Sequence, residues 1–132
     1  MNEDSLQKLV VVDDDPSMAR LIADVANISG YAVSYYCDAR EFVAQYNNDL
    51  DVIFLDLIMP NINGFEVIDF LAERKSCSQL ILMTGFHDDL LQNARLSALN
   101  KGLNFVSGFK KPFRFNDMHS LLIKLRAVRS GI

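Results

Sequence analysis

Five short apolar runs alternate with segments of helical period along the chain, and this alternation limits the possible folds more than any other feature. The runs cover residues 8–13, 31–36, 51–56, 79–84 and 104–109. The first, third and fourth runs are almost entirely apolar, which is typical of parallel strands buried on both faces of a sheet. After each run, apolar residues recur every three or four positions, as in amphipathic helices. Five strand–helix units in a row predict a doubly wound α/β domain with a five-stranded parallel sheet.

Several of the helical segments have recognisable ends. Asp15 directly precedes Pro16, and an aspartate N-cap followed by proline is a favoured helix start, so Asp15 is assigned to capping the first helix. Gly30 and Gly102 end the first and fourth helices, because glycine commonly follows a helix, and the fifth helix is expected to start near Asn116. The apolar positions that mark the five helices are Met18, Leu21, Ile22, Val25 and Ile28; Phe42, Val43 and Tyr46; Val67, Ile68 and Leu71; Leu90, Leu91, Ala94, Ala98 and Leu99; and Met118, Leu121, Leu122, Leu125 and Val128.

The length and composition of the chain indicate one globular domain. Its 132 residues suit a single domain with a core over about 7–128 and no output domain after it. The net charge of −4 disfavours direct binding to nucleic acid or to an anionic membrane, because both need a basic surface. No apolar run reaches the roughly 18 residues that span a bilayer, and the acidic N-terminus MNEDSLQK is unlike a secretory signal. Cys37 and Cys77 form no disulfide framework or metal motif, so we expect reduced thiols in a cytoplasmic protein.

Acidic residues stand at the ends of two predicted strands. Three consecutive aspartates begin at the end of the first run, and Asp56 ends the third. The carboxyl ends of parallel strands meet at one edge of a sheet, where ligands bind, so Asp13, Asp14 and Asp56 are expected to share one pocket. Three carboxylates would repel one another and raise their pKa values, and a divalent cation removes this repulsion. Oxygen-only ligands with free coordination positions suit Mg²⁺, which retains waters and accepts phosphate oxygens.

Three residues at this edge have the chemistry of phosphoryl transfer. Asp56 is an isolated carboxylate at a strand tip, and beside a cation it can act as a nucleophile toward phosphorus. Thr84 ends the fourth run, and its hydroxyl can donate a hydrogen bond to a phosphoryl oxygen. Lys111 follows the fifth run, and its ammonium can bind phosphate as a point charge, while Pro112 disfavours a helical backbone at the lysine.

The pieces VVVDD, DLIMPNING, LILMT and KKPF together resemble the receiver domain of two-component response regulators, the CheY-like family, over essentially the whole chain. The resemblance implies a flavodoxin-like (βα)5 fold with the strand order 2-1-3-4-5. It also implies that Asp56 accepts a phosphoryl group from a phosphohistidine on a sensor histidine kinase or phosphotransfer protein. Thr84 and Lys111 would hold the phosphoryl oxygens. Such a domain is a signalling phosphoacceptor that catalyses only its own phosphorylation and dephosphorylation.

The same resemblance implies how Mg²⁺ and partners are bound. Asp14, Asp56 and the backbone carbonyl of Ile58 would coordinate the ion directly, and Asp13 would act mostly through a metal-bound water. The implied partners are the kinase or phosphotransfer protein, a fused or separate output domain, and a second copy contacted through the fourth and fifth helices.

Three features depart from the family pattern or tune it. Family members usually carry Tyr or Phe three residues before the lysine, where this chain has Gly108, so Phe105 or Phe109 would replace that ring or the readout differs. The stretch HDDLLQNARLSALNK predicts an extended fourth helix and hence an altered partner surface. Ile58 and Phe86, which would flank the attacking water, are apolar and cannot orient it, so we predict a slowly hydrolysing phosphoaspartate.

Three other interpretations remain. A haloacid-dehalogenase-type phosphatase is one, because Asp13, Asp15 and Ser17 imitate its nucleophile loop, although it needs an acidic pair after the lysine and only Asp117 follows Lys111. A flavin-binding module of similar topology is the second, although three aspartates would repel its phosphate. The third is a receiver-like interaction domain that is never phosphorylated.

Overall fold

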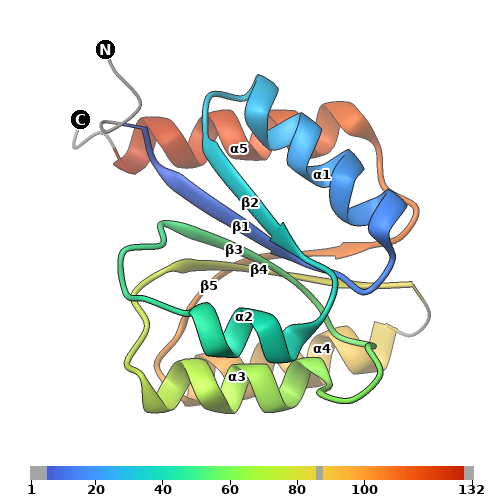
Figure 1. Ribbon diagram of the computed structural model, residues 1–132, viewed down its shortest axis with the longest axis vertical. Coiled ribbons are helices and arrows are strands. Elements are labelled where there is room, and N and C mark those ends of the chain that lie inside the picture. Colours follow the sequence, from blue (N-terminus) through green and yellow to red (C-terminus); the bar gives the residue numbers. More distant parts are fainter. Residues whose placement is uncertain (1–5, 86–87, 130–132) are drawn as a thin grey trace.

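Five strands and five helices alternate in the computed structural model, which describes residues 6–85 and 88–129 (Figure 1). Each strand begins and ends within one residue of its predicted position, so the predicted alternation is confirmed. Within the described residues, no helix combines the length and the apolarity needed to cross a membrane. In chain order the elements are β1 (Lys8–Val12), α1 (Pro16–Ile28), β2 (Ala32–Tyr36), α2 (Ala39–Gln45), β3 (Val52–Asp56), α3 (Gly64–Glu73), β4 (Gln79–Thr84), α4 (Asp88–Asn100), β5 (Asn104–Lys110) and α5 (Phe115–Arg129).

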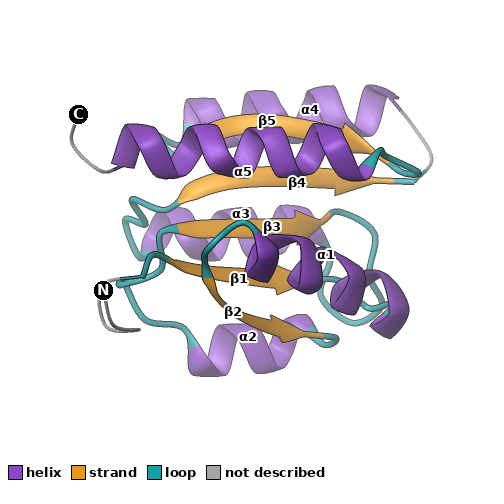
Figure 2. Cartoon of the chain, turned by 90° about the horizontal axis from the view of Figure 1, so that it is seen from above, coloured by secondary structure: helices purple, strands orange, loops and turns teal. Residues whose placement is uncertain are grey.

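The strands form one parallel sheet in the order β2-β1-β3-β4-β5, as the resemblance implies. Helices α1 and α5 cover one face, and α2, α3 and α4 cover the other (Figures 1 and 2). Successive side chains of a strand point to opposite faces, so the three central strands need apolar residues at nearly every position. β1, β3 and β4 are accordingly buried along almost their whole length. Each buried aliphatic side chain stabilises the fold by roughly 1.5 to 3 kcal/mol. The three central strands therefore hold the residues at their carboxyl ends in fixed positions.

Side-chain caps fix where the helices start. The Asp15 carboxylate accepts hydrogen bonds from the backbone N–H groups of Ser17 (3.0 Å) and Met18 (3.4 Å), which confirms its predicted capping role. At the start of α3, the Asn63 side chain accepts from the Glu66 N–H, and the Glu66 carboxylate accepts from the Asn63 N–H. Each such cap typically contributes about 1 kcal/mol. Both caps lie directly beside strand tips, so they also fix the loops in which the acidic residues lie.

Polar contacts join the end of α1 to α5. The buried Ser29 hydroxyl donates to the Val25 carbonyl (2.8 Å) and lies 2.9 Å from Nδ1 of His119. The Tyr31 hydroxyl donates to the Leu122 carbonyl (2.7 Å), and Arg126 Nη1 donates to the Ser29 carbonyl. The carbonyl of Ser29, the last residue of the α1 cap, therefore finds its donor on α5, although the last turn of α1 carries no basic residue.

Strand β5 is irregular, and the irregularity decides which residues meet α4. The β4–β5 register shifts between Leu80 and Ile81, so that Phe105 pairs with Leu80 and Gly108 with Leu82. Phe105 and Gly108 consequently lie on the same face, toward α4. A Cβ on Gly108 would lie 2.9 Å from both δ carbons of Leu91, so α4 packs directly onto the bare backbone there.

Candidate functional site

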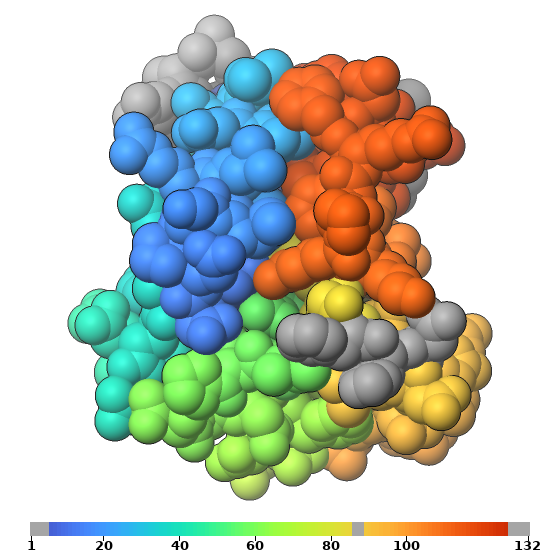
Figure 3. Space-filling view, turned by 90° about the vertical axis from the view of Figure 1, so that its right-hand side faces the viewer, coloured from blue at the N-terminus to red at the C-terminus, as the bar shows by residue number. Residues whose placement is uncertain are grey.

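The carboxyl ends of four strands meet at one edge of the molecule. Figure 3 looks onto this edge, where the start of α1, the β3–α3 loop, the end of β4 and the β5–α5 connection lie around one spot. Segments almost a hundred residues apart in sequence are in contact here, since Lys111 forms an ion pair with Asp13. The predicted convergence of the strand ends is therefore present.

Three carboxylates form a compact cluster at this edge. Oxygens of Asp13, Asp14 and Asp56 all lie within 4.8 Å of one another. Asp13 is fully buried and Asp56 is only 5% exposed, whereas Asp14 faces solvent. The cluster is thus closed on its inner side and open beside Asp14, where a ligand has access.

Backbone contacts fix the two buried aspartates. The Asp13 N–H donates to the Tyr36 carbonyl at the end of β2 (3.1 Å), and the Asp13 carboxylate accepts from the Asp15 N–H (3.0 Å). The Asp56 carboxylate accepts from the Ile58 N–H (3.2 Å). Each carboxylate thus has one oxygen oriented by its own turn, which leaves the other oxygen for a partner.

Gly64 allows the loop after β3 to fold back onto the strand tip. Its N–H donates to the Leu57 carbonyl (3.0 Å), and a Cβ at this position would lie 2.6 Å from Leu57 Cα and 3.1 Å from the Asp56 carbonyl oxygen. Asn61 adopts φ 71°, a left-handed conformation that asparagine tolerates. Asparagine and glycine are typical turn residues, but the sequence does not reveal that residue 64 must lack a side chain because it touches the backbone beside Asp56.

Lys111 connects the two buried aspartates. Its ammonium Nζ lies 2.7 Å from Asp13 Oδ2 and 3.3 Å from Asp56 Oδ2, and its side chain is mostly buried. Its backbone N–H donates to the Thr84 carbonyl (2.8 Å), and the following peptide bond to Pro112 is cis. The lysine is therefore attached to the tip of β4 through its backbone and to the tips of β1 and β3 through its side chain.

Burial and neighbouring charges shift the pKa values of Asp56 and Lys111. Burial raises the pKa of Asp56 to about 7, and the Asp13 charge adds to this effect, while Lys111 and the Ile58 N–H oppose it. Burial alone would lower the pKa of Lys111, but its hydrogen bond to Asp13 and the charges of Asp56 and Asp13 outweigh burial, so this pKa is raised. The site thus holds three carboxylates, two of which contact the one ammonium, and these oxygen donors fit a small divalent cation.

The remaining predicted site residues lie at the same edge, with one exception. Thr84 is fully buried at the end of β4 and pairs in register with Lys110. Ile58 follows Asp56 by two residues and is 41% exposed, so it lies at the mouth of the acidic cluster. Phe86, which was predicted to flank an attacking water, lies outside the described residues.

Comparison with known proteins gives one consistent result. Residues 9–123 match the model of the response regulator receiver domain. Transcriptional regulatory protein TcrA of Mycobacterium tuberculosis is 30% identical over 124 residues, which are 92% of this chain and 45% of TcrA. The uncharacterized transcriptional regulatory protein YrkP of Bacillus subtilis is 29% identical over 88% of this chain and 48% of YrkP. The chain therefore spans about half the length of these curated relatives.

Solved structures of response regulators and receiver domains match this chain over almost the whole length of both chains. A response regulator from Colwellia psychrerythraea superposes with a TM-score of 0.85 at 35% identity, covering 94% of this chain and 99% of that one. A CheY-like receiver domain protein from Methanospirillum hungatei has a TM-score of 0.78 at 22% identity, covering 97% and 100%, and this likeness concerns the fold alone.

Proposed function

This chain belongs to the response regulator receiver domain family, and on that basis we propose that Asp56 accepts a phosphoryl group from a phosphohistidine on a sensor histidine kinase or phosphotransfer protein. The observation that carries the proposal is the position of Lys111, whose ammonium contacts both Asp13 and Asp56 within a compact acidic cluster. A structural ion pair needs one carboxylate. Three carboxylates and a lysine at the tips of separate strands are the equipment for binding a cation together with a phosphoryl group.

The acidic cluster fits Mg²⁺ as the required ion. The donor set consists of oxygens alone, these oxygens lie within 4.8 Å of one another, and Asp14 opens to solvent so that the ion can keep waters. We assign Asp14, Asp56 and the backbone carbonyl of Ile58 to direct coordination and Asp13 to contact through a water. When bound, Mg²⁺ supplies positive charge that offsets the carboxylates and the transferred phosphoryl oxygens.

Asp56, Lys111 and Thr84 each have a separate role in the phosphoryl transfer. An Asp56 carboxylate oxygen forms a bond to phosphorus while the phosphorus–nitrogen bond of the donor breaks. Lys111 lies closer to Asp13 (2.7 Å) than to Asp56 (3.3 Å), so it can stay anchored on Asp13 while its other N–H groups turn to the phosphoryl oxygens. The Thr84 hydroxyl, on the neighbouring strand tip, donates to a further phosphoryl oxygen. The product carries a charge of about −2 where one carboxylate stood, and this change is the signal.

Position 108 carries no aromatic ring, so the change at Asp56 must reach the partner surface through other residues. Gly108 packs against Leu91 of α4, and Phe105 is the aromatic residue of β5 that shares this face, with Arg95 Cζ 5.9 Å from its ring centre. Phe109 packs on the opposite side, against Phe113. We assign the readout to α4 and its contacts with Phe105 and Gly108, and the recipient to an output domain, fused or separate, or to a second copy docked on α4 and α5.

Phosphorylation by a small donor tests the proposal directly. Intact protein incubated with acetyl phosphate and Mg²⁺ should gain the mass of one phosphate, and the gain should disappear with EDTA or with Asp56→Asn. Asp15→Asn is the matched control, because asparagine also caps helices and residue 15 lies outside the site. Absence of any gain would favour the interaction domain without phosphorylation. A gain lost with Asp13→Asn but kept with Asp56→Asn would favour the phosphatase.

A further inference from the structure

The two edges of the sheet are protected very differently. β5 contains a register shift and ends in the exposed Lys110, two devices that discourage pairing with another strand. β2 has the sequence AVSYY, without a charge, a proline or a bulge, and no described strand lies beyond it (Figure 2). Its residues Ser34 and Tyr35 are exposed, Tyr35 to 46%. An unprotected edge of this kind is a template for another strand.

The backbone groups on the open side of β2 can be identified from its pairing with β1. The Ala32 N–H donates to Gln7 (2.9 Å), and the Tyr36 carbonyl accepts from Asp13 (3.1 Å), so even-numbered residues of β2 bond to β1. In a parallel ladder the residues between them point their N–H and C=O groups the other way. Val33 and Tyr35 therefore present one donor and one acceptor each along the open edge.

We infer that two copies of this chain associate through β2, with the strands antiparallel about a twofold axis at Ser34. This register places Val33 of each copy opposite Tyr35 of the other, so every outward donor meets an outward acceptor. Ser34 lies on the axis, and its own backbone groups stay bonded to β1. The outward backbone groups of β2 are thus complementary to those of a second β2 in this register.

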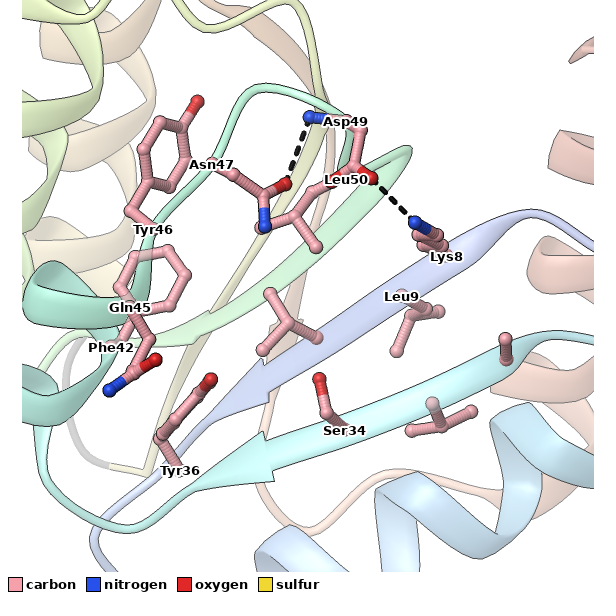
Figure 4. Close-up of a pocket in the computed structure, with 13 residues that line it drawn as sticks. Lys8, Leu9, Ser34, Tyr36, Phe42, Gln45, Tyr46, Asn47, Asp49 and Leu50 are labelled. Carbon is pink, nitrogen blue, oxygen red and sulfur yellow. Dashed lines mark hydrogen bonds and ion pairs between the residues drawn. The ribbon is translucent and has the colours of Figure 1, made fainter. Parts of the chain in front are cut away.

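The side chains fit the same register. Tyr36 of one copy faces the small Ala32 of the other, on the side of the sheet where a cavity of about 300 Å³ lies between β1, β2 and α2 (Figure 4). Val10 and Leu50 give this cavity an apolar lining, and the small Ala32 leaves room beside it for the second copy's Tyr36 ring, which packs on Phe42 of its own copy (ring centres 6.0 Å apart). On the other side of the sheet, Val33 packs against Tyr35 of the second copy, a β-branched and aromatic pair of the kind that stabilises sheets.

Charges beyond the strand ends are complementary. In this register Asp38, two residues after β2, comes opposite Gly30 of the second copy, while its carboxylate also caps α2 and pairs with Arg40 Nη2 (2.8 Å) in its own copy. The Arg126 guanidinium lies directly beside Gly30, where it donates to the Ser29 carbonyl. The twofold axis repeats this acid–base approach at both ends. Because the paired strands are short, the interface is small and association is expected only in the micromolar to millimolar range.

Sedimentation of the full chain tests this inference. Between about 10 µM and 1 mM, the range of weak association, the mass should rise from that of a 14.9 kDa monomer toward a dimer. Tyr35→Lys places a charge on the edge, and Tyr35→Pro removes an outward N–H together with the ring that meets Val33, so both should keep the protein monomeric without removing a hydrogen bond to β1. Leu99→Lys and Ile123→Lys, on exposed positions of α4 and α5, are the matched controls and should leave the association unchanged.

Amide hydrogen exchange supplies a second measurement that does not depend on a variant folding. The Val33 and Tyr35 amides should become protected as the concentration rises, whereas the Ser34 amide is protected by β1 at every concentration. A mass that stays monomeric at 1 mM overturns the inference. An association abolished by Leu99→Lys or Ile123→Lys but untouched by the Tyr35 variants also overturns it, and assigns the contact to α4 and α5.

Discussion

Two lysine–aspartate pairs lie at opposite ends of the sheet and differ mainly in burial. At the carboxyl end, Lys111 Nζ is 2.7 Å from Asp13, with side chains 17% and 0% exposed. At the amino end, Lys8 Nζ is 2.5 Å from Asp49, and the side chains are 53% and 55% exposed. The distances are similar, but water screens the exposed pair and leaves it worth little. Burial, rather than pairing as such, raises the pKa of Asp56 beside Lys111.

The largest expected effect is at Asp56, because burial raises the pKa of this carboxyl to about 7. An unfolded aspartate titrates near 4, so the folded protein holds this proton more tightly, and metal-free stability falls as pH rises from about 4 to about 7. Asp56→Asn removes the penalty. We expect it to raise the free energy of unfolding by at most about 4 kcal/mol at pH 8, and by clearly less at pH 5.

Urea titrations in EDTA at the two pH values measure this difference. Asp49→Asn at the exposed end is the control and should change stability by no more than about 0.5 kcal/mol at either pH. Equal effects of the two variants would contradict the claim that burial distinguishes the two ends of the sheet.

A second prediction concerns the lysines themselves. Lys111→Met leaves two buried carboxylates without their cation, and we expect it to lower the metal-free free energy of unfolding by about 3 kcal/mol at pH 8. Lys8→Met should cost less than about 1 kcal/mol, since its partner is solvated. Chemical denaturation of both variants beside the parent protein checks this. A larger loss from Lys8→Met would show that burial is not the deciding variable.

The packing of the loop after β3 gives a third prediction. Gly64→Ala would place a methyl group against Leu57 and the Asp56 backbone, so we expect a loss of about 2 kcal/mol in stability and slower phosphorylation by acetyl phosphate. Gly85→Ala is the control for stability, because a Cβ there would meet no heavy atom of the described residues within 4 Å apart from its chain neighbours. Thermal unfolding distinguishes them, and equal stability of the two variants would mean that the carboxyl end is loosely packed.

The smallest expected effect is kinetic. Ile58 is exposed at the mouth of the site and cannot hydrogen-bond an attacking water, so the phosphorylated protein in Mg²⁺ should lose its phosphate over minutes or longer. Ile58→Asn supplies an amide that can orient water, and we expect loss about tenfold faster, a barrier change of about 1.4 kcal/mol. Mass spectrometry over time measures both rates. A half-life of seconds in the parent protein would refute the prediction.

Sequence patterns predicted the fold and which residues lie together at the candidate site, because both depend on local signals. Apolar runs gave the strands, and polar residues at the ends of those runs gave Asp13, Asp14, Asp56 and Lys111. The close approach of Gly64 to Leu57, the His119–Ser29 contact and the register shift in β5 were not predictable in this way. Each depends on how distant segments pack, and neither periodicity nor spacing carries that information.

Helical periodicity also predicted more accurately where helices form than which residues they bury. Leu21, Ile28 and Leu99 all marked predicted helices correctly, yet Ile28 is 66% exposed and the other two are about half exposed. Apolar residues every three or four positions follow the turn of a helix and lie on one of its faces. Whether that face is buried depends on whether a neighbouring element covers it.

The contact between Gly108 and Leu91 has a consequence for redesigning this protein. Gly108 has no side chain, and the Leu91 side chain of α4 occupies the space beside it. A larger side chain at position 108 therefore needs a smaller one at position 91. Grafting an aromatic ring onto residue 108 alone would force the helix outward. A transplant of the usual ring therefore requires a simultaneous truncation of residue 91, and the two exchanges should compensate for each other when made together.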